Sequence, residues 1–268
     1  MIHSGLHACA RADSWRDRYW QRLAHDTLDA ELILSQALAM QPIHEGQRRL
    51  FSLAQCMETP DLLAGQVRQH YPAASSARLQ RAYHSVLHQD LALSLLAPLA
   101  LRLFRDGRVG LPTAEQIFVV PVEQDGQRQL RWFMEAGQTE VDEQGFVARM
   151  SELTTDWYPF FRRMLGVSPG SYWSSVALAL GAPFAAVWNL ARPGPTCELA
   201  QSWLKGFQNE ASAFVDWIPV SFGDQQTAFP QRRGCCLAYL LPDMGHCGTC
   251  GVHRKQRLQA ACVIARSA

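Results

Sequence analysis

The sequence predicts an α+β fold: a mainly helical body with a small antiparallel β element and a cysteine-rich segment at the C-terminus. Apolar residues recur at helical spacing over most of the chain before the cysteines, which indicates amphipathic helices. One pair of β-prone runs flanks an Asp-Gly turn, and four of the eight cysteines fall within sixteen positions near the end of the chain.

Length and composition indicate one large body with a small appendage. With 268 residues, 48% of them hydrophobic, 18% charged and a net charge of +1, the chain resembles an ordinary globular protein. We divide it into a helical body, residues 1–230, and a C-terminal segment, residues 231–268. The composition does not favour nucleic acid as a partner. We expect no secretory signal and no transmembrane segment, and hence a cytoplasmic protein.

The first half of the chain is predicted to be helical. The apolar spacing indicates a helix from 14 to about 40, a second one from 60 to 70, and a longer helix from 76 to 105. We expect this longer helix to be bent by Pro98 and to end near Gly107, because proline removes a backbone donor and glycine tolerates the chain reversal.

A hairpin is predicted next. The β-prone runs 117–122 and 129–134 flank Asp125 and Gly126, a pair that adopts positive φ at little cost. Pro121 suggests an edge strand, since it cannot donate to a ladder.

Helical patterns then resume and lead to the cysteine segment. The predicted helices cover 145–165, 171–191 and 197–214; an irregular connection follows at 219–230, then a short strand at 236–241 and a closing helix at 252–266.

The cysteine spacing predicts a metal centre. Cys235, Cys236, Cys247 and Cys250 form C-C-x10-C-x2-C. The C-x2-C pair suits either zinc or iron. Adjacent residues in an extended chain point to opposite faces, so a C-C pair reaches one ion only through a sharp kink. A 2Fe-2S cluster relaxes this demand, because it presents two irons to four ligands. We therefore predict a 2Fe-2S cluster; which cysteine binds which iron stays open.

Two alternatives for this centre remain. The four cysteines could hold a structural zinc ion, or His246 or His253 could replace one cysteine as a ligand. The other cysteines lack this spacing and are interpreted as ordinary small buried residues; they are Cys9, Cys56, Cys197 and Cys262.

Positive charge gathers around the predicted ligands. Residues 231–268 carry six Lys or Arg and one acidic residue, so the remainder of the chain is net negative. Arg232, Arg233 and Arg254 are candidates for tuning the cluster or for docking a partner, since a nearby cation stabilises an added electron and attracts an anion.

His84 and His88 lie at i and i+4 of a predicted helix, which is a spacing that metal ligands use. No glutamate follows the first histidine as in a zinc protease. We interpret them as a buried or solvated pair and leave them out of the site.

The stretch RRGCCLAYLLPDMGHCGTCGVHR, residues 232–254, resembles the C-terminal motif of the ferric-siderophore reductase (FhuF-like) family, whose members bind a 2Fe-2S cluster through C-C-x10-C-x2-C. The resemblance implies a cytoplasmic oxidoreductase that reduces iron(III) in an imported siderophore complex by one electron and releases iron(II). Over residues 1–230 the likeness is one of general character, so no catalytic residue beyond the cluster can be carried over.

The resemblance also implies the partners. They are a ferric siderophore as substrate and an external electron donor of reductase, ferredoxin or flavodoxin type, because no G-x-G-x-x-G follows a strand. Peripheral association with the inner membrane is compatible with it. Two rival interpretations are a 2Fe-2S sensor or electron carrier without chelate reductase activity, and a zinc-stapled siderophore-binding protein. The sequence does not select the siderophore or the oligomeric state.

Overall fold

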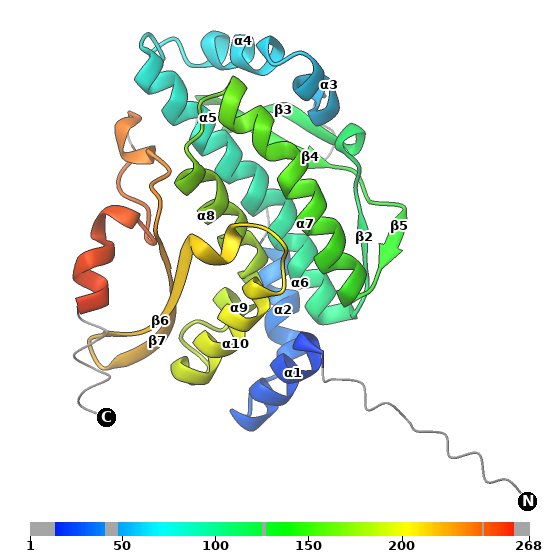
Figure 1. The fold of residues 1–268 in the computed structure, drawn as a ribbon, viewed down its shortest axis with the longest axis vertical. Helices are drawn as coiled ribbons and strands as arrows, with labels where there is room; N and C mark the ends of the chain where they lie inside the picture. Colours follow the sequence, from blue (N-terminus) through cyan, green and yellow to red (C-terminus); the bar gives the residue numbers. More distant parts are fainter. Residues whose placement is uncertain (1–13, 41–47, 125–126, 243, 260–268) are drawn as a thin grey trace, which may run out of the picture.

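The structure is a computed structural model that describes residues 14–40, 48–124, 127–242 and 244–259; it is mainly helical with small antiparallel sheets (Figure 1). The α-helices are α1 Trp15–His25, α2 Ala30–Ala39, α3 Leu53–Glu58, α4 Asp61–His70, α5 Ala77–Leu91, α6 Ala97–Asp106, α7 Glu143–Pro159, α8 Pro169–Leu180, α9 Ala182–Ala186 and α10 Pro193–Lys205. The strands are β1 Phe51–Ser52, β2 Val109–Leu111, β3 Ile117–Gln124, β4 Gln127–Met134, β5 Thr139–Val141, β6 Val215–Phe222 and β7 Gln225–Arg232. Shorter turns of helix are η1 Ala92–Leu96, η2 Ala114–Gln116, η3 Phe160–Met164, η4 Ala211–Ala213, η5 Ala238–Leu240 and η6 Gly251–His253.

The long helix predicted for residues 76–105 forms the axis of the body as α5, η1 and α6. Ser76 caps its start, and Gly107 ends it with φ of 78°. The π turn η1 lies directly before Pro98, where the helix must absorb a missing backbone donor. Among the described residues, this run, Ala77–Asp106, is long and apolar enough to cross a membrane by length and composition, but 67% of its apolar window is buried inside the fold. It therefore acts as a core helix.

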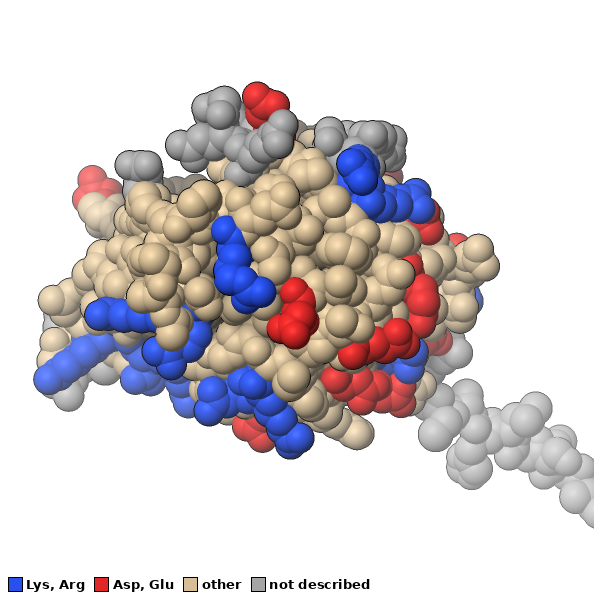
Figure 2. Space-filling view, turned by 90° about the horizontal axis from the view of Figure 1, so that it is seen from above, with Lys and Arg blue, Asp and Glu red and all other residues tan. Residues whose placement is uncertain are grey.

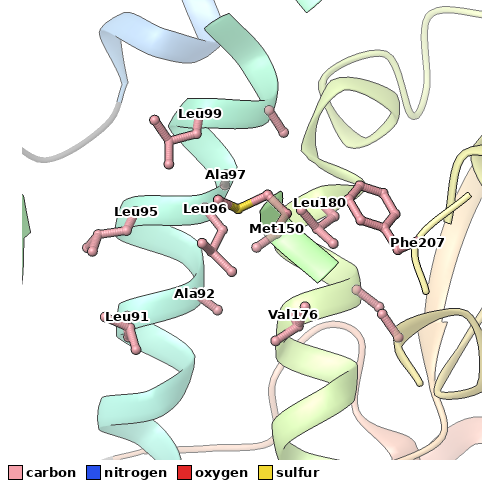
Figure 3. Close-up of a cluster of buried hydrophobic side chains, with 14 of the residues drawn as sticks. Leu91, Ala92, Leu95, Leu96, Ala97, Leu99, Met150, Val176, Leu180 and Phe207 are labelled. Atoms are coloured by element: carbon pink, nitrogen blue, oxygen red, sulfur yellow. The ribbon is translucent and has the colours of Figure 1, made fainter. Parts of the chain in front are cut away.

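The hydrophobic core lies between this axis and α8. Ala92 and Leu96 point toward Val176 and Leu180 of α8 (Figure 3). Helix α8 is buried on almost every side, as expected for a helix that is apolar around most of its circumference. Three of its buried residues are polar instead of apolar: the serines at 171, 174 and 175, which share one face.

The predicted hairpin is confirmed as β3 and β4, and its turn residues, Asp125 and Gly126, lie outside the described residues. The sheet order is β1-β3-β4, so β3 is a middle strand and the expectation of an edge strand was wrong. The two-residue β1 pairs only with Phe118 and Val119, and Pro121 lies beyond its reach. The proline is tolerated because β1 is too short to need its donor.

Residues 14–40 form two helices, α1 and α2, rather than the single helix predicted. Thr27 between them has a φ of 58°, and the side chain of Asp29 caps the second helix through Leu32 N. A residue in the left-handed conformation cannot continue an α-helix, so the helix breaks at Thr27. The apolar spacing continues across this break, which is why a single helix was predicted.

The other predicted helices are present, with some differences in where they break and end. Residues 145–165 become α7 and η3, and residues 171–191 become α8 and α9, whereas α10 ends at Lys205, so that residues 206–214 do not continue it. Residues 219–230, predicted as irregular, form a second hairpin with the strands β6 and β7. Its turn includes Gly223, whose φ is 61°. Strand β7 crosses the boundary proposed at 230/231, and the division into two domains stays a prediction.

Candidate metal centre

The C-terminal segment with the four cysteines follows directly after β7 (Figure 1). Val215 at the start of β6 pairs with Arg232 at the end of β7, so the hairpin delivers the chain to Cys235 at a fixed place beside α8. The predicted strand at 236–241 was wrong: Leu237 has a φ of 63°, and the turn η5 follows it. This left-handed residue directly after Cys236 supplies the kink that adjacent cysteines need to serve one centre.

Gln231 links the loop that carries Cys235 and Cys236 to the loop that carries Cys247 and Cys250. Its fully buried side-chain amide donates to the carbonyls of Arg232 at 2.8 Å, Cys250 at 3.1 Å and Thr249 at 3.3 Å. Its Oε1 accepts from Arg257 Nη1 at 2.9 Å. Every polar atom of this side chain is therefore used, as a buried amide requires.

Three glycines let the segment approach the body closely. A Cβ on Gly234 would lie 2.0 Å from the carbonyl oxygen of Gly170 at the start of α8. A Cβ on Gly251 would lie 2.5 Å from the carbonyl oxygen of Gly234. These contacts leave no room for a side chain, so glycine is required here by space rather than by φ.

The four predicted cysteines cluster, and their sulfurs form two pairs. Cys236 Sγ lies 3.8 Å from Cys247 Sγ, while Cys235 interacts with Cys250. Cys236 and Cys250 are 2% and 1% exposed, whereas the other two are half-buried. The backbone N–H of Leu237 donates to Cys235 Sγ at 3.4 Å. The chain thus presents one buried and one half-buried sulfur in each pair.

The thiols titrate unevenly. The hydrogen bond between Cys236 and Cys247 lowers the pKa of Cys236 to about 5 and raises the pKa of Cys247. Burial raises the pKa of Cys235. The Cys236–Cys247 pair therefore gives up its first proton more readily than Cys235 does.

Arg232 is completely buried. Its guanidinium reaches into the body between α5 and α8, where it hydrogen-bonds to Gln89, Ser174 and Ser175. Of the two roles predicted for it, docking a partner at the surface is therefore not open to this residue.

Arg233 and Arg254 share one carboxylate. Asp216 on β6 accepts from Arg233 Nε at 3.1 Å and from Arg254 Nε at 2.9 Å. Although burial raises the pKa of Asp216, these hydrogen bonds lower it below its ordinary value of 3.8. Asp216 thus joins the start and the end of the segment to the hairpin, and it offsets part of the positive charge of both arginines.

An aromatic rim borders the cysteines. Tyr239 stacks on His246 with ring centroids 4.8 Å apart, and His246 meets His253 edge-on at 5.0 Å. His246 Nδ1 lies 3.5 Å from Cys250 Sγ, so ligation by this histidine stays open as an alternative. Tyr239 is partly exposed, together with Met244 and Val252, which gives the site an apolar outer face.

The closing helix is shorter at its start than predicted. Cys250 precedes the single turn η6, and residues 254–259 are helical; the rest of the predicted helix lies outside the described residues. On the face that Figure 2 shows, most Lys and Arg gather toward the side where Figure 1 places the C-terminal segment, and most Asp and Glu lie toward the other side, next to a smaller group of Lys and Arg. The charge asymmetry expected from the sequence is thus visible on the surface.

The remaining candidates, two histidines, belong to the helical body. His84 and His88 are buried; His84 Nδ1 lies 3.0 Å from the Leu165 carbonyl oxygen, and His88 stacks on Tyr172 at 4.2 Å. Burial lowers the pKa of His88 to about 3, so its ring is neutral. Both histidines serve the core, as interpreted from the sequence.

Cys56 and Cys197 are buried, and burial raises the pKa of each thiol to about 12. Both are therefore inert small core residues, as predicted. Cys9 and Cys262 lie outside the described residues.

A hollow of about 1280 Å³ lies between the start of α1 and the outer face of α7. Its lining includes no residue of the cysteine segment. Glu143, one of its acidic residues, already accepts hydrogen bonds from the backbone of Trp15 and Arg16. The hollow thus lies where Glu143 caps the start of α1, and it is separate from the cysteine centre.

Several residues of the centre were missed by the sequence analysis. They are Gln231, Asp216 and the serines of α8, all of which depend on the β6–β7 hairpin or on contacts distant in sequence. One signal was present: the run SYWSSVALAL places three serines on one face of an otherwise apolar helix. Buried hydroxyls at that spacing indicate a buried polar partner.

The donor set fits a 2Fe-2S cluster. Four thiols are the ligands such a cluster takes, with two protein ligands to each iron. The sulfurs are arranged as two pairs, Cys236 with Cys247 and Cys235 with Cys250. The same four thiols could also hold one zinc ion, so the preference for a 2Fe-2S cluster rests on the C-C-x10-C-x2-C spacing.

Comparison with known proteins agrees with this geometry. Residues 232–250 match the family model described as the FhuF 2Fe-2S C-terminal domain, and the match contains all four clustered cysteines. No curated protein and no solved structure matches the chain. Residues 232–250 are therefore similar to a 2Fe-2S domain of the FhuF type, with its four clustered cysteines, and the match does not extend into the helical body.

Proposed function

We propose that this protein is a ferric-siderophore reductase, which passes one electron to iron(III) in an imported siderophore complex and releases iron(II) in the cytoplasm. The observation that carries the proposal is the clustering of Cys235, Cys236, Cys247 and Cys250 inside a segment that matches the FhuF 2Fe-2S domain. Held by these four sulfurs, a 2Fe-2S cluster would supply a centre that accepts and gives up one electron at a time.

The surrounding residues prepare the site for this role. Cys236 and Cys250 lie on the buried side, where the body excludes water from the ligands. Tyr239, Met244 and Val252 leave an apolar outer face that a chelate or an electron donor can approach. The positive charge of the segment favours anionic partners.

The substrate class follows from the chemistry of iron release. Hydroxamate and catecholate oxygens are hard ligands, which hold iron(III) much more tightly than iron(II). One electron converts the iron to its weakly held state, and the chelator can then exchange it for other ligands. The electron comes from an external donor of reductase, ferredoxin or flavodoxin type, which is oxidised by one electron in each turnover.

The test is a single turnover without oxygen. Protein reduced with dithionite, and then freed of it, is mixed with a ferric hydroxamate and a chromogenic iron(II) chelator. We expect reoxidation of the protein and about one iron(II) per chain, since a 2Fe-2S centre delivers one electron. The gallium(III) complex of the same hydroxamate has no accessible reduced state and should leave the protein reduced.

Two outcomes would contradict the proposal. A protein that takes up and holds its electron in the presence of several ferric chelates would be a carrier or a sensor. A colourless protein that contains zinc after anaerobic expression would be a zinc-stapled binding protein.

A further inference from the structure

Arg232 is a buried cation for which the described residues provide no ionic partner. Its side chain is 0% exposed. Nε donates to Ser174 Oγ at 2.9 Å, Nη1 to Gln89 Oε1 at 3.2 Å, and Nη2 to Ser175 Oγ at 2.9 Å and to the Ser171 carbonyl at 3.2 Å. All four acceptors are neutral. None of the ion pairs formed within the described ranges includes this residue.

The hydroxyl oxygens of Ser174 and Ser175 are free to accept hydrogen bonds from Arg232. Ser174 Oγ donates to the Gly170 carbonyl at 2.5 Å, and Ser175 Oγ donates to the Ser171 carbonyl at 2.9 Å. Each hydroxyl has its proton committed to helix α8, so its lone pairs are left for the guanidinium. The serine face of α8 and Gln89 of α5 form a polar cradle for Arg232 in an otherwise apolar interface.

A lone cation in this position is costly without an anion. Removing an ion from water costs several kcal/mol even after relaxation, and buried charges are normally paired. Hydrogen bonds to neutral groups orient the guanidinium but do not neutralise it. Arg232 also contacts the cysteine segment directly, because its backbone N–H donates to the Thr249 carbonyl at 3.3 Å, next to Cys250. Its charge acts on the Cys236–Cys247 pair, which is able to carry negative charge.

We propose that Arg232 is the buried counter-cation of the cysteine centre and that its charge raises the reduction potential of the bound cluster. A cluster with four thiolate ligands is anionic, and reduction adds one further negative charge. A fixed positive charge in a buried, weakly screened position therefore stabilises the reduced form more than the oxidised form. This inference rests on the 2Fe-2S assignment within the proposed function, and it does not depend on which molecule takes the electron.

The three arginines grouped together by the sequence analysis thus separate into two roles. Arg233 and Arg254 are partly exposed, share Asp216 and fasten the segment to the hairpin. Salt and the carboxylate both weaken their field. Arg232 is the one among these three whose charge is buried and unpaired, so the tuning of the cluster falls to it.

The test measures the midpoint potential by dye-mediated titration with dithionite, followed by the visible and EPR spectra. Arg232→Gln should lower the equilibrium constant for reduction at least tenfold, about 59 mV for one electron. Arg232→Lys keeps the charge and should stay within about threefold of the wild type. Equal shifts in both variants, or no shift in Arg232→Gln, would overturn the proposal. Exchanging Arg233 and Arg254 together for Gln should shift the potential less than Arg232→Gln does.

A second variant covers the case in which Arg232→Gln fails to fold or to load a cluster. Gln89→Glu keeps the shape of the acceptor and places a carboxylate on Arg232 Nη1, so the cation is neutralised without being removed. It should lower the potential as Arg232→Gln does, while Gln36→Glu, the same exchange at an exposed position of α2, should leave it unchanged. An unshifted potential in Gln89→Glu would contradict the proposal.

These measurements involve no siderophore. A cluster-loaded protein that fails to reduce ferric chelates would defeat the proposed reductase activity and leave the role of Arg232 testable. A normal single turnover combined with unshifted potentials would do the reverse.

Discussion

The helical body and the cysteine segment are stabilised in different ways. In the body, side chains such as Leu96, Met150 and Leu180 are buried in one cluster between helices (Figure 3). The segment instead depends on a buried amide, a glycine contact and a shared carboxylate, namely Gln231, Gly234 and Asp216. The body draws its stability from buried apolar area, whereas the segment draws it from a few specific polar and backbone contacts. We therefore expect single changes to have a graded effect in the body and an all-or-none effect at the cysteines.

The largest difference should appear between two buried cysteines. Cys236→Ser should abolish or gravely destabilise the cluster, because serine replaces a thiolate ligand. Cys197→Ser, in the body, should leave the visible spectrum unchanged, since its thiol is an inert core group. Iron and sulfide analysis together with the visible spectrum checks both. Similar losses in the two variants would remove the basis for the ligand assignment.

A truncation in the core should affect stability without affecting the cluster. Leu96→Ala removes a side chain that is 2% exposed and should lower the free energy of unfolding by about 2–5 kcal/mol. Leu93→Ala, one turn away and 37% exposed, should cost much less. Denaturant unfolding of the apoprotein gives these values. If Leu96→Ala bleached the folded protein, the two regions would be more closely coupled than their contacts indicate.

The glycine contact gives an intermediate effect. Gly234→Ala forces a methyl group against the Gly170 carbonyl and should cost about 1–3 kcal/mol, with faster loss of iron to a chelator. Gly245→Ala is the matched control, because a Cβ there would meet nothing within 4 Å. Equal rates of iron loss in the two variants would show that the close approach of the segment to α8 does not hold the cluster.

The smallest effect should come from Asp216. Asp216→Asn breaks the pairs with Arg233 and Arg254 and should cost below about 1 kcal/mol, because these pairs are partly exposed. The pKa of Asp216 is lowered in the fold, so its contribution is present at neutral pH and is lost as the pH falls below about 4.

Unfolding of both proteins across this pH range checks the prediction. The difference between Asp216→Asn and the wild type should shrink toward pH 3. Asp224→Asn, in the exposed turn between β6 and β7, should show no such dependence. A difference that stays constant from pH 7 to pH 3 would mean that the carboxylate charge is not what holds the segment.

The sequence predicted the body well, because its helices follow local rules. Helix α4 and the β3–β4 hairpin were found from spacing, proline and turn residues. The break at Thr27 was missed, since the apolar spacing runs through it. Local patterns thus locate elements but do not show which tertiary contacts interrupt them.

The four ligand cysteines could be predicted from the sequence, whereas the residues that hold the cysteine segment in place could not. Fixed spacing identified the four cysteines because their chemistry constrains sequence separation directly. The hairpin of β6 and β7 was obscured by Pro219 and Pro230, which lie opposite other residues of the ladder yet read as turn signals. Without that hairpin, neither the burial of Arg232 nor the proximity of Asp216 could be inferred.

The cradle of Arg232 makes the position of the cysteine centre depend on the packing of the helical body. Gln89 and the serines of α8 all precede Arg232 in the chain, and the ligand cysteines follow it. The guanidinium reaches its acceptors only where α5 packs against α8, so the path of the chain into the cysteines depends on that packing.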